Sequence, residues 1–175
     1  MKIIILGPTG TGKGTQAKLI AKLLKLNHIE IGKEFRKIAN YDKYIKELIS
    51  KGKLVPDNIT LKLVKNLIKN NKNFILDGFP RDLNQTKSFK EKIDLVLYLK
   101  TSKKNLIKRL LLRKRFDDTK KNIEERYEIF LKRTLPVINY YKKGGILKVI
   151  DGNPSIKNVS KEIKKVLIRF RKFDN

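Results

Sequence analysis

Short runs of branched apolar residues alternate along the chain with stretches in which apolar positions recur at helical spacing. The short runs predict strands buried on both faces, because a half-exposed strand would alternate apolar and polar side chains. We expect strands at residues 2–6, 73–77, 94–99 and 146–150. We expect helices at residues 16–26, 33–39, 42–50, 57–70, 102–112, 123–142 and 155–170.

Local signals bound several of these helices. Asp57 follows Pro56 and is a candidate N-cap. Pro136 lies inside the predicted helix at 123–142 and should kink it, because proline removes one helical hydrogen bond. Strands that alternate with helices predict an α/β fold with a parallel sheet. In such sheets the ligand site lies beyond the carboxyl ends of the strands.

One glycine-rich segment joins the first strand to the first helix. Residues 7–16 read GPTGTGKGTQ. Glycines let successive backbone N–H groups point inward toward a phosphate, and the helix N-terminus adds partial positive charge. Lys13 can bridge the β- and γ-phosphates of a nucleotide. Gly14 occupies the place where the strict pattern has a hydroxyl residue, so Thr15 is the hydroxyl that can reach Mg²⁺.

Length and composition exclude several classes of protein. The 175 residues and 40% hydrophobic content predict a single domain with a real core. The absence of cysteine excludes a disulfide scaffold, a cysteine-ligated zinc site and a thiol nucleophile. No apolar run approaches the ~20 residues that span a bilayer, and the N-terminal run is too short for a signal peptide. We therefore expect a soluble cytoplasmic protein without a membrane partner.

The net charge is strongly positive. The chain has 43 Lys and Arg against 17 Asp and Glu, which leaves a formal net charge of +26. Such an excess attracts polyanions, including nucleotides and nucleic acid. The lysines are scattered over nearly every segment, which favours solvated helix faces and only nonspecific nucleic-acid binding. A nucleotide-binding protein that acts on nucleic acid or the ribosome remains an alternative.

Four segments carry a resemblance to one family. They are the GKGTQ sequence at residues 12–16, DGFPR at residues 77–81 with Gln85 four positions later, GKLV at residues 52–55, and an arginine-rich stretch at residues 109–126. In this order and spacing the chain resembles the adenylate kinases, in the form with a short lid. The resemblance covers essentially the whole chain.

The resemblance implies a three-layer fold of the P-loop NTPase type. It places the core at residues 1–28, 57–112 and 122–175, a helical insertion that binds the nucleoside monophosphate at about residues 29–56, and a minimal lid at about residues 113–121. It also implies a monomer that binds ATP and AMP and transfers a phosphoryl group from Mg-ATP to AMP, giving two ADP.

The resemblance also implies roles for single residues. The residues implied for ATP are Gly10, Thr11, Gly12, Lys13, Gly14, Thr15, Arg109, Arg113 and Asn153. Those implied for AMP are Ile31, Gly32, Arg36, Lys53, Val55, Gly78, Arg81 and Gln85. Lys13, Arg81, Arg109, Arg115 and Arg126 are implied to act in catalysis. Asp77 is implied to orient Mg²⁺ through water, with Thr15 as a second contact.

The chain departs from the family pattern at two positions. Ile31 stands where the family usually has threonine close to the acceptor base, and Lys33 stands where it usually has an aspartate that holds water on Mg²⁺. Gln85 favours adenine, because an amide can donate to and accept from a purine edge. A CMP or UMP kinase therefore remains an alternative. His28, the only histidine, is expected to have a packing or surface role.

Overall fold

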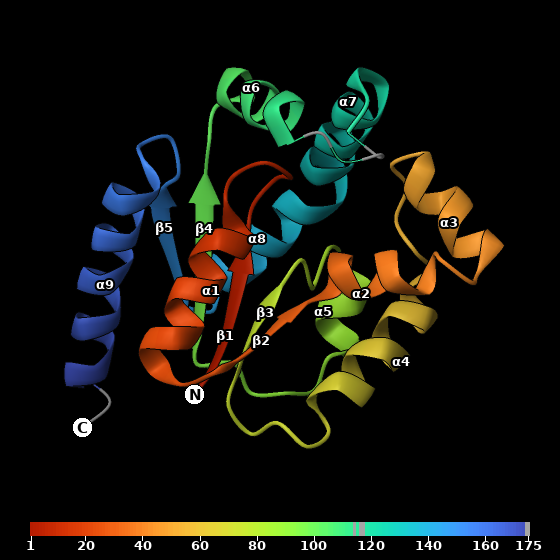
Figure 1. Cartoon of the computed structure of the whole chain (residues 1–175). Helices are drawn as coiled ribbons and strands as arrows, with labels where there is room; N and C mark the ends of the chain where they lie inside the picture. The colour runs from red at the N-terminus through yellow and green to blue at the C-terminus, as the bar shows by residue number, and fades with distance from the viewer. Residues whose placement is uncertain (114, 116–117, 174–175) are drawn as a thin grey trace.

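The computed structural model describes residues 1–113, 115 and 118–173, and a parallel five-stranded sheet lies at its centre (Figure 1). The strand order is β2-β3-β1-β4-β5. The strands are β1 (Lys2–Leu6), β2 (Asn27–Glu30), β3 (Phe74–Asp77), β4 (Leu95–Lys100) and β5 (Leu147–Asp151). The predicted α/β fold with a parallel sheet is confirmed.

Helices cover both faces of the sheet. They are α1 (Lys13–Leu24), α2 (Ile31–Ile38), α3 (Lys43–Ser50), α4 (Asp57–Ile68), α5 (Leu83–Ser88), α6 (Lys103–Arg113), α7 (Lys120–Ile129), a π-helical turn η1 (Phe130–Thr134), α8 (Leu135–Lys143) and α9 (Ile156–Phe173). The first and last helices, α1 and α9, pack on one face. Helices α4 and α8, with η1, pack on the other.

Alternation along β1 explains the two layers of core. Ile3 and Ile5 point into the cluster formed with α1 and α9, whereas Ile4 and Leu6 point into the opposite cluster. All four side chains are almost completely buried. Burying an isoleucine or leucine side chain contributes roughly 1.5–3 kcal/mol, so this strand is a major source of stability.

The strand register brings the functional segments to one edge. Ile5 and Glu30 both pair with Asp77, so β1, β2 and β3 end at the same level. The glycine-rich loop leaves β1 at this edge, and helices α6 and α7 lie over it (Figure 1). The functional loops thus lie at the carboxyl edge of the sheet, where the sequence predicts a ligand site.

Apart from bounds that differ by up to three residues, the predicted elements agree with the structure except in four places. The strand β2 and the helix α5 were not expected, and the predicted N-cap at Asp57 is wrong, because Pro56 occupies that position and Asp57 begins the helix. The predicted helix at 123–142 is interrupted by η1 directly before Leu135 and Pro136. Proline lacks the N–H that a regular turn would use there, so the wider turn has a local cause. None of the helices within the described ranges combines the length and apolar character that a bilayer span needs.

Candidate active site

A cavity of about 610 Å³ opens at the carboxyl edge of the sheet. Its wall comes from the glycine-rich loop and α1, from α2 and the 52–55 segment, from the loop after β3, and from α6 and the start of α9. Two groups of loops thus face each other across the ends of β1 and β3. The volume and the many charged residues of the wall suit a charged ligand rather than a small apolar one.

The glycine-rich loop has the backbone geometry that phosphate binding requires. Gly10 and Gly12 both have φ of 92°, a left-handed conformation that other residues rarely adopt. A Cβ on Gly10 would lie 2.8 Å from Leu110 Cγ, so α6 also packs directly on the loop. Gly14 and Thr15 belong to the first turn of α1, whose N–H groups point toward the cavity.

Lys13 lies inside this loop. Its Nζ donates a hydrogen bond to the carbonyl of Pro8 at 2.9 Å. Burial lowers the pKa of Lys13 to about 8, while the negative charge of Asp77 offsets part of that shift. A half-buried ammonium group that donates, among the described residues, to one carbonyl is prepared to bind a further anion.

Arg36 and Arg81 form a cationic end of the cavity. The guanidinium of Arg36 donates to Glu30 Oε1 at 2.8 Å, and Arg81 Nε donates to the carbonyl of Gly78 at 2.9 Å. Both guanidinium groups lie close to Gly32, where a Cβ would meet Arg36 at 3.3 Å and Arg81 at 3.9 Å. Burial lowers the pKa of Arg81, and the charges of Arg126 and Arg36 act in the same direction. Two arginines at one place are suited to a phosphate group.

Arg109 and Arg113 occupy the opposite wall, on α6. Arg109 donates to the carbonyls of Gly152 at 2.8 Å and Asn153 at 2.9 Å, and so holds the loop after β5. Arg113 makes a two-pronged contact with Asp118, at 2.7 and 2.6 Å, which Arg126 joins at 3.4 Å. Asp118 therefore contacts both Arg126, which is predicted to act in catalysis, and Arg113, which is predicted to bind ATP.

The balance of effects on Asp118 shows how strongly it is held. Burial alone would raise the pKa of this carboxyl group. The hydrogen bond and charge of Arg113, together with the charge of Arg126, outweigh burial and hold the pKa below its usual range. Asp118 is therefore ionised at neutral pH and occupies the two arginines in the absence of substrate.

Asp77 is the carboxylate best placed to hold a metal ion at this site. Its side chain is 7% exposed, and it accepts no hydrogen bond within the described part of the chain. Its Oδ2 would lie 3.2 Å from a Cβ on Gly14, so the absence of a side chain there lets the carboxylate approach α1. A largely buried carboxylate that lines the cavity beside a phosphate-binding loop fits a hydrated divalent cation, with the hydroxyl of Thr15 on the same wall.

Gln85 is more restrained than the sequence suggested. Its Oε1 accepts from the backbone N–H of Arg81 at 2.8 Å, and its Nε2 donates to Asp57 Oδ1 at 2.8 Å. Asp57 also lies 3.7 Å from Arg133. Although Gln85 lines the cavity, both ends of its amide already have protein partners.

One part of the cavity wall is apolar. Ile31, Phe35, Ile49 and Val55 line it. Lys53 belongs to the same wall, next to Val55. The side chain of Lys33, by contrast, is exposed and is not part of the cavity wall. The charge reversal at position 33 therefore does not place a lysine inside the site.

The structure brings nearly all of the predicted site residues to this one cavity. Those on its wall are Gly10, Thr11, Gly12, Lys13, Gly14, Thr15, Ile31, Gly32, Arg36, Lys53, Val55, Asp77, Gly78, Arg81, Gln85, Arg109, Arg113, Arg115 and Arg126. Asn153 is not on the wall: its side-chain oxygen accepts from Ser102 and Asn105. Positions 114, 116 and 117 of the predicted lid lie outside the described residues.

Sequence reasoning missed three acidic residues of the site. Glu30, Asp57 and Asp118 each hold a predicted ligand-binding side chain in place. Glu34, which the sequence offers as a neighbour of position 33, is paired with Lys37 at 2.8 Å on the outside. Glu30 lies six positions before Arg36 in the chain, and their opposite charges were the signal that could have indicated this pairing.

Comparison with known proteins assigns a family to these features. A profile of the family described as "Adenylate kinase" matches residues 5–146. The "Adenylate kinase" of Prochlorococcus marinus (strain MIT 9301) is 40% identical over 174 residues, which cover 93% of this chain and 96% of that protein. The proteins of the same name from Rickettsia bellii and Clostridium kluyveri are 37% and 33% identical over 210 and 213 residues. These alignments cover 95% of this chain in both cases, and 99% and 98% of the two relatives.

Proposed function

Since this chain belongs to the adenylate kinase family, we propose that it transfers the terminal phosphoryl group of ATP to AMP and forms two molecules of ADP. The observation that carries this proposal is the single cavity with a phosphate-binding loop on one wall and the Arg36–Arg81 pair on another. Two nucleotides can meet there with their phosphates facing each other. The family resemblance drawn from residues 12–16 and 77–81 is confirmed.

The donor nucleotide binds at the glycine-rich loop. The backbone N–H groups at residues 10–15 and Nζ of Lys13 hold its phosphates. Arg109 keeps the loop after β5 against this end of the cavity through its contacts with Gly152 and Asn153. The wall there, including Ile156, then borders the adenine.

The acceptor phosphate binds between Arg36 and Arg81. An oxygen of this phosphate attacks the γ-phosphorus of ATP while the bond from phosphorus to the bridging oxygen breaks, and ADP leaves with that oxygen. Phosphoryl transfer depends mainly on position and on charge compensation. Arg113, Arg115 and Arg126 supply that compensation from α6, α7 and the segment between them, and removal of one should slow transfer about 100-fold or more.

Mg²⁺ accompanies the donor phosphates in this proposal. Asp77 would hold it through water, and the Thr15 hydroxyl is a second candidate contact. When bound, the ion neutralises charge on the phosphates of the donor. The burial of Asp77 without a hydrogen-bond donor within the described residues supports this assignment.

The lid segment must keep water away from the reacting group, because water is a competing acceptor. The connection from α6 to α7 spans only residues 114–119. Within the described part of it, Asp118 ties Arg113 to Arg126. We propose that closure here is a small motion of this segment together with α7.

A panel of acceptors tests the proposed activity. ADP formation is measured with Mg-ATP and each of AMP, CMP, UMP and GMP, and AMP is expected to give the highest kcat/KM. A chain that transfers to no monophosphate would not have the proposed activity.

The second candidate acceptor is a pyrimidine monophosphate. The engagement of both ends of the Gln85 amide, together with Ile31 in the wall, favours keeping this alternative, since Ile31 offers no donor and one of the two Gln85 N–H groups already donates to Asp57. A higher kcat/KM for CMP or UMP than for AMP would establish it.

We further propose a monomeric, cytoplasmic enzyme whose binding of nucleic acid is nonspecific. One chain supplies both the donor wall and the acceptor wall of the cavity, which supports the monomer. Sedimentation velocity at micromolar concentration tests the oligomeric state, with a single species of the 20.4 kDa chain expected.

A further inference from the structure

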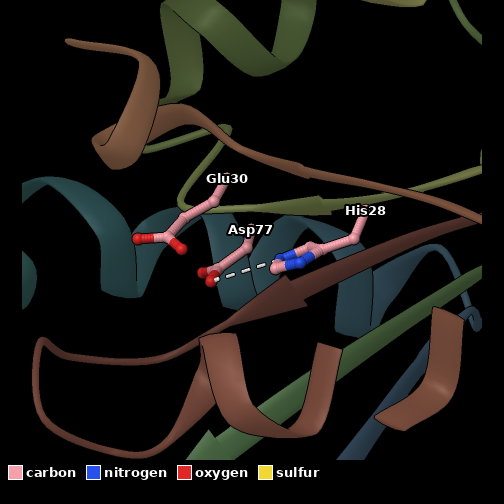
Figure 2. Close-up of side chains that lie close together, drawn as sticks. All are labelled: His28, Glu30 and Asp77. Carbon is pink, nitrogen blue, oxygen red and sulfur yellow. Dashed lines mark ion pairs between the residues drawn. The ribbon is translucent and has the colours of Figure 1, made fainter. Parts of the chain in front are cut away.

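His28, Glu30 and Asp77 come together at the junction of β2 and β3 (Figure 2). Each offers a ligand atom, and these three atoms lie within 4.8 Å of one another. Histidine and two carboxylates are a donor set that holds divalent metals in proteins. His28 has no role in the proposed phosphoryl transfer, and Glu30 acts there only by holding Arg36.

The strand register explains why these residues meet. His28 and Glu30 are two positions apart on β2, so their side chains leave the same face of the sheet. Glu30 pairs with Asp77 across the parallel ladder, and His28 pairs with the residue two positions before it, Ile75. Figure 2 shows the Asp77 carboxylate between the other two side chains.

Two of the three groups, Asp77 and His28, have few partners within the described residues. The Asp77 side chain is only 7% exposed. Its ion-pair contact within the described residues is His28, at 3.9 Å from Nε2 to Oδ2, and its charge also acts on Lys13 and Arg81. That separation exceeds a hydrogen bond. His28 Nε2 is itself buried and has no hydrogen-bond partner in the described structure. Such orphaned polar atoms call for a ligand.

Glu30 divides its two oxygens between neighbours. Oε1 accepts from Arg36, which neutralises part of the carboxylate charge. Oε2 faces the first turn of α1, where a Cβ on Gly14 would lie 3.7 Å away. The same Cβ would lie 3.2 Å from Asp77 Oδ2, so Gly14 leaves room for both carboxylates on this side.

We propose that His28, Glu30 and Asp77 form a binding site for a divalent first-row transition-metal ion, with His28 Nε2 and one oxygen from each carboxylate as ligands. Ligand atoms on one ion lie at most about 4.2 Å apart, so closing the site requires shifts of under about 1 Å. The imidazole nitrogen sets the preference, because Mg²⁺ favours an all-oxygen shell and Mn²⁺ accepts nitrogen more readily.

This site goes beyond the proposed phosphoryl transfer, since its ligands come from the protein alone and no nucleotide is needed. It shares Asp77 with the proposed Mg²⁺ contact, so a metal bound here would lie beside the donor phosphates. The two proposals are nevertheless separable, because one is measured by metal binding and the other by ADP formation.

Binding of Mn²⁺ to the nucleotide-free full chain tests the site. The electron paramagnetic resonance signal of free Mn²⁺ should fall to a plateau that corresponds to one ion per chain. Glu30→Gln and His28→Gln should each weaken Mn²⁺ binding at least about tenfold. Mg²⁺ should displace Mn²⁺ only at a concentration at least about tenfold higher.

Glu34→Gln is the matched control, because it removes the same charge from the next helix while its partner is the exposed Lys37. It should leave Mn²⁺ binding unchanged, and thermal unfolding of each variant confirms that it folds. The proposal is overturned if the wild-type chain binds no Mn²⁺ saturably. It is also overturned if Glu34→Gln weakens binding as much as Glu30→Gln, or if Mg²⁺ competes equally.

The same preparations are assayed for ADP formation from Mg-ATP and AMP. Transfer without Mn²⁺ binding rejects the metal site alone. Mn²⁺ binding without transfer to any monophosphate rejects the proposed function alone.

Discussion

The cationic side chains of the site are held by internal partners before any substrate arrives. Glu30 holds Arg36, Asp118 holds Arg113, and backbone carbonyls hold Arg109. These contacts keep the guanidinium groups in position in a chain that carries a formal net charge of +26. A bound phosphate exchanges some of these contacts for stronger ones, so the arginines need little reorganisation during transfer.

The lowered pKa of Lys13 predicts how nucleotide affinity depends on pH. Above about pH 8 the free protein loses the Lys13 proton, so binding of ATP must take a proton up. The Kd for ATP should therefore rise between pH 8 and 10, by up to about tenfold per pH unit. Calorimetric titration over this range, in buffers of different ionisation enthalpy, measures both the affinity and the proton uptake.

Lys13→Arg is the matched variant, since arginine keeps its charge throughout this range. Its ATP affinity should be nearly independent of pH, even where it is weaker overall. A wild-type Kd that stays constant from pH 7 to 10 would contradict the assignment.

The same shift affects stability with a definite sign. Because the folded pKa of about 8 lies below the usual value of 10.5, the unfolded chain binds the extra proton between these two values. The contribution of Lys13 to the free energy of unfolding therefore rises as the pH increases from 8 to 10.5.

Site residues that belong to contiguous motifs could be predicted from the sequence, whereas the side chains that hydrogen-bond to them could not. Lys13 and Arg81 belong to short patterns whose chemistry is local. The pairing of Gln85 with Asp57 joins positions 28 residues apart, and no periodicity or motif reports such a contact. The carboxylate of Glu30 was missed because it lies at the end of β2, a strand that was not predicted, and its partner Arg36 lies on the following helix.

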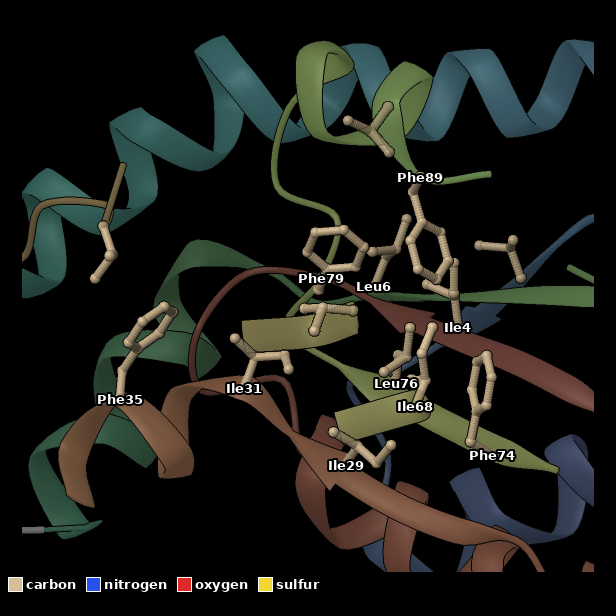
Figure 3. Close-up of a cluster of buried hydrophobic side chains, with 14 of the residues drawn as sticks. Ile4, Leu6, Ile29, Ile31, Phe35, Ile68, Phe74, Leu76, Phe79 and Phe89 are labelled. Carbon is tan, nitrogen blue, oxygen red and sulfur yellow. The ribbon is translucent and has the colours of Figure 1, made fainter. Parts of the chain in front are cut away.

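At the scale of elements, the prediction succeeded where the signal was long or strongly apolar. The strands β1 and β4 are continuous apolar runs in the interior of the sheet. Their side chains belong alternately to the hydrophobic cluster drawn in Figure 3 and to the cluster on the opposite face of the sheet. The missed strand β2 has four residues, of which only Ile29 is buried. The missed helix α5 has six mostly polar residues and is stabilised by its N-cap, Asp82, which accepts from Gln85 N–H.

One contact links the two sides of the cavity and predicts the behaviour of the lid. Asn122, near the start of α7, donates through Nδ2 to the carbonyl of Ser50 at the end of α3, at 2.8 Å. Asn122→Ala removes this bond, which is worth about 1 kcal/mol, and should favour a more open cavity. ATP hydrolysis without acceptor should then rise about fivefold relative to transfer to AMP.

The two rates are compared in one coupled assay. Asn158→Ala, an exposed position on α9, is the control and should leave the ratio unchanged. An unaltered ratio in Asn122→Ala would show that this contact does not shield the reacting group.

At the scale of the whole molecule, the net charge of +26 governs encounters with polyanions. Lysines spread over the helices create attraction without a specific binding surface. Affinity for a single-stranded oligonucleotide should therefore fall about 100-fold between 50 and 200 mM salt, because each neutralised phosphate releases counterions. Fluorescence anisotropy at several salt concentrations measures this slope. Tight binding that survives 200 mM salt would contradict a purely nonspecific surface.

The central claim is that one cavity holds two nucleotides with their phosphates in a line. A crystal structure with a compound in which five phosphates join two adenosines tests it most directly. We predict that the phosphate chain runs from the glycine-rich loop and Lys13 to Arg36 and Arg81, with one adenosine beside Ile31 and Val55. A compound bound elsewhere, or one that leaves the glycine-rich loop without phosphate, would contradict the account.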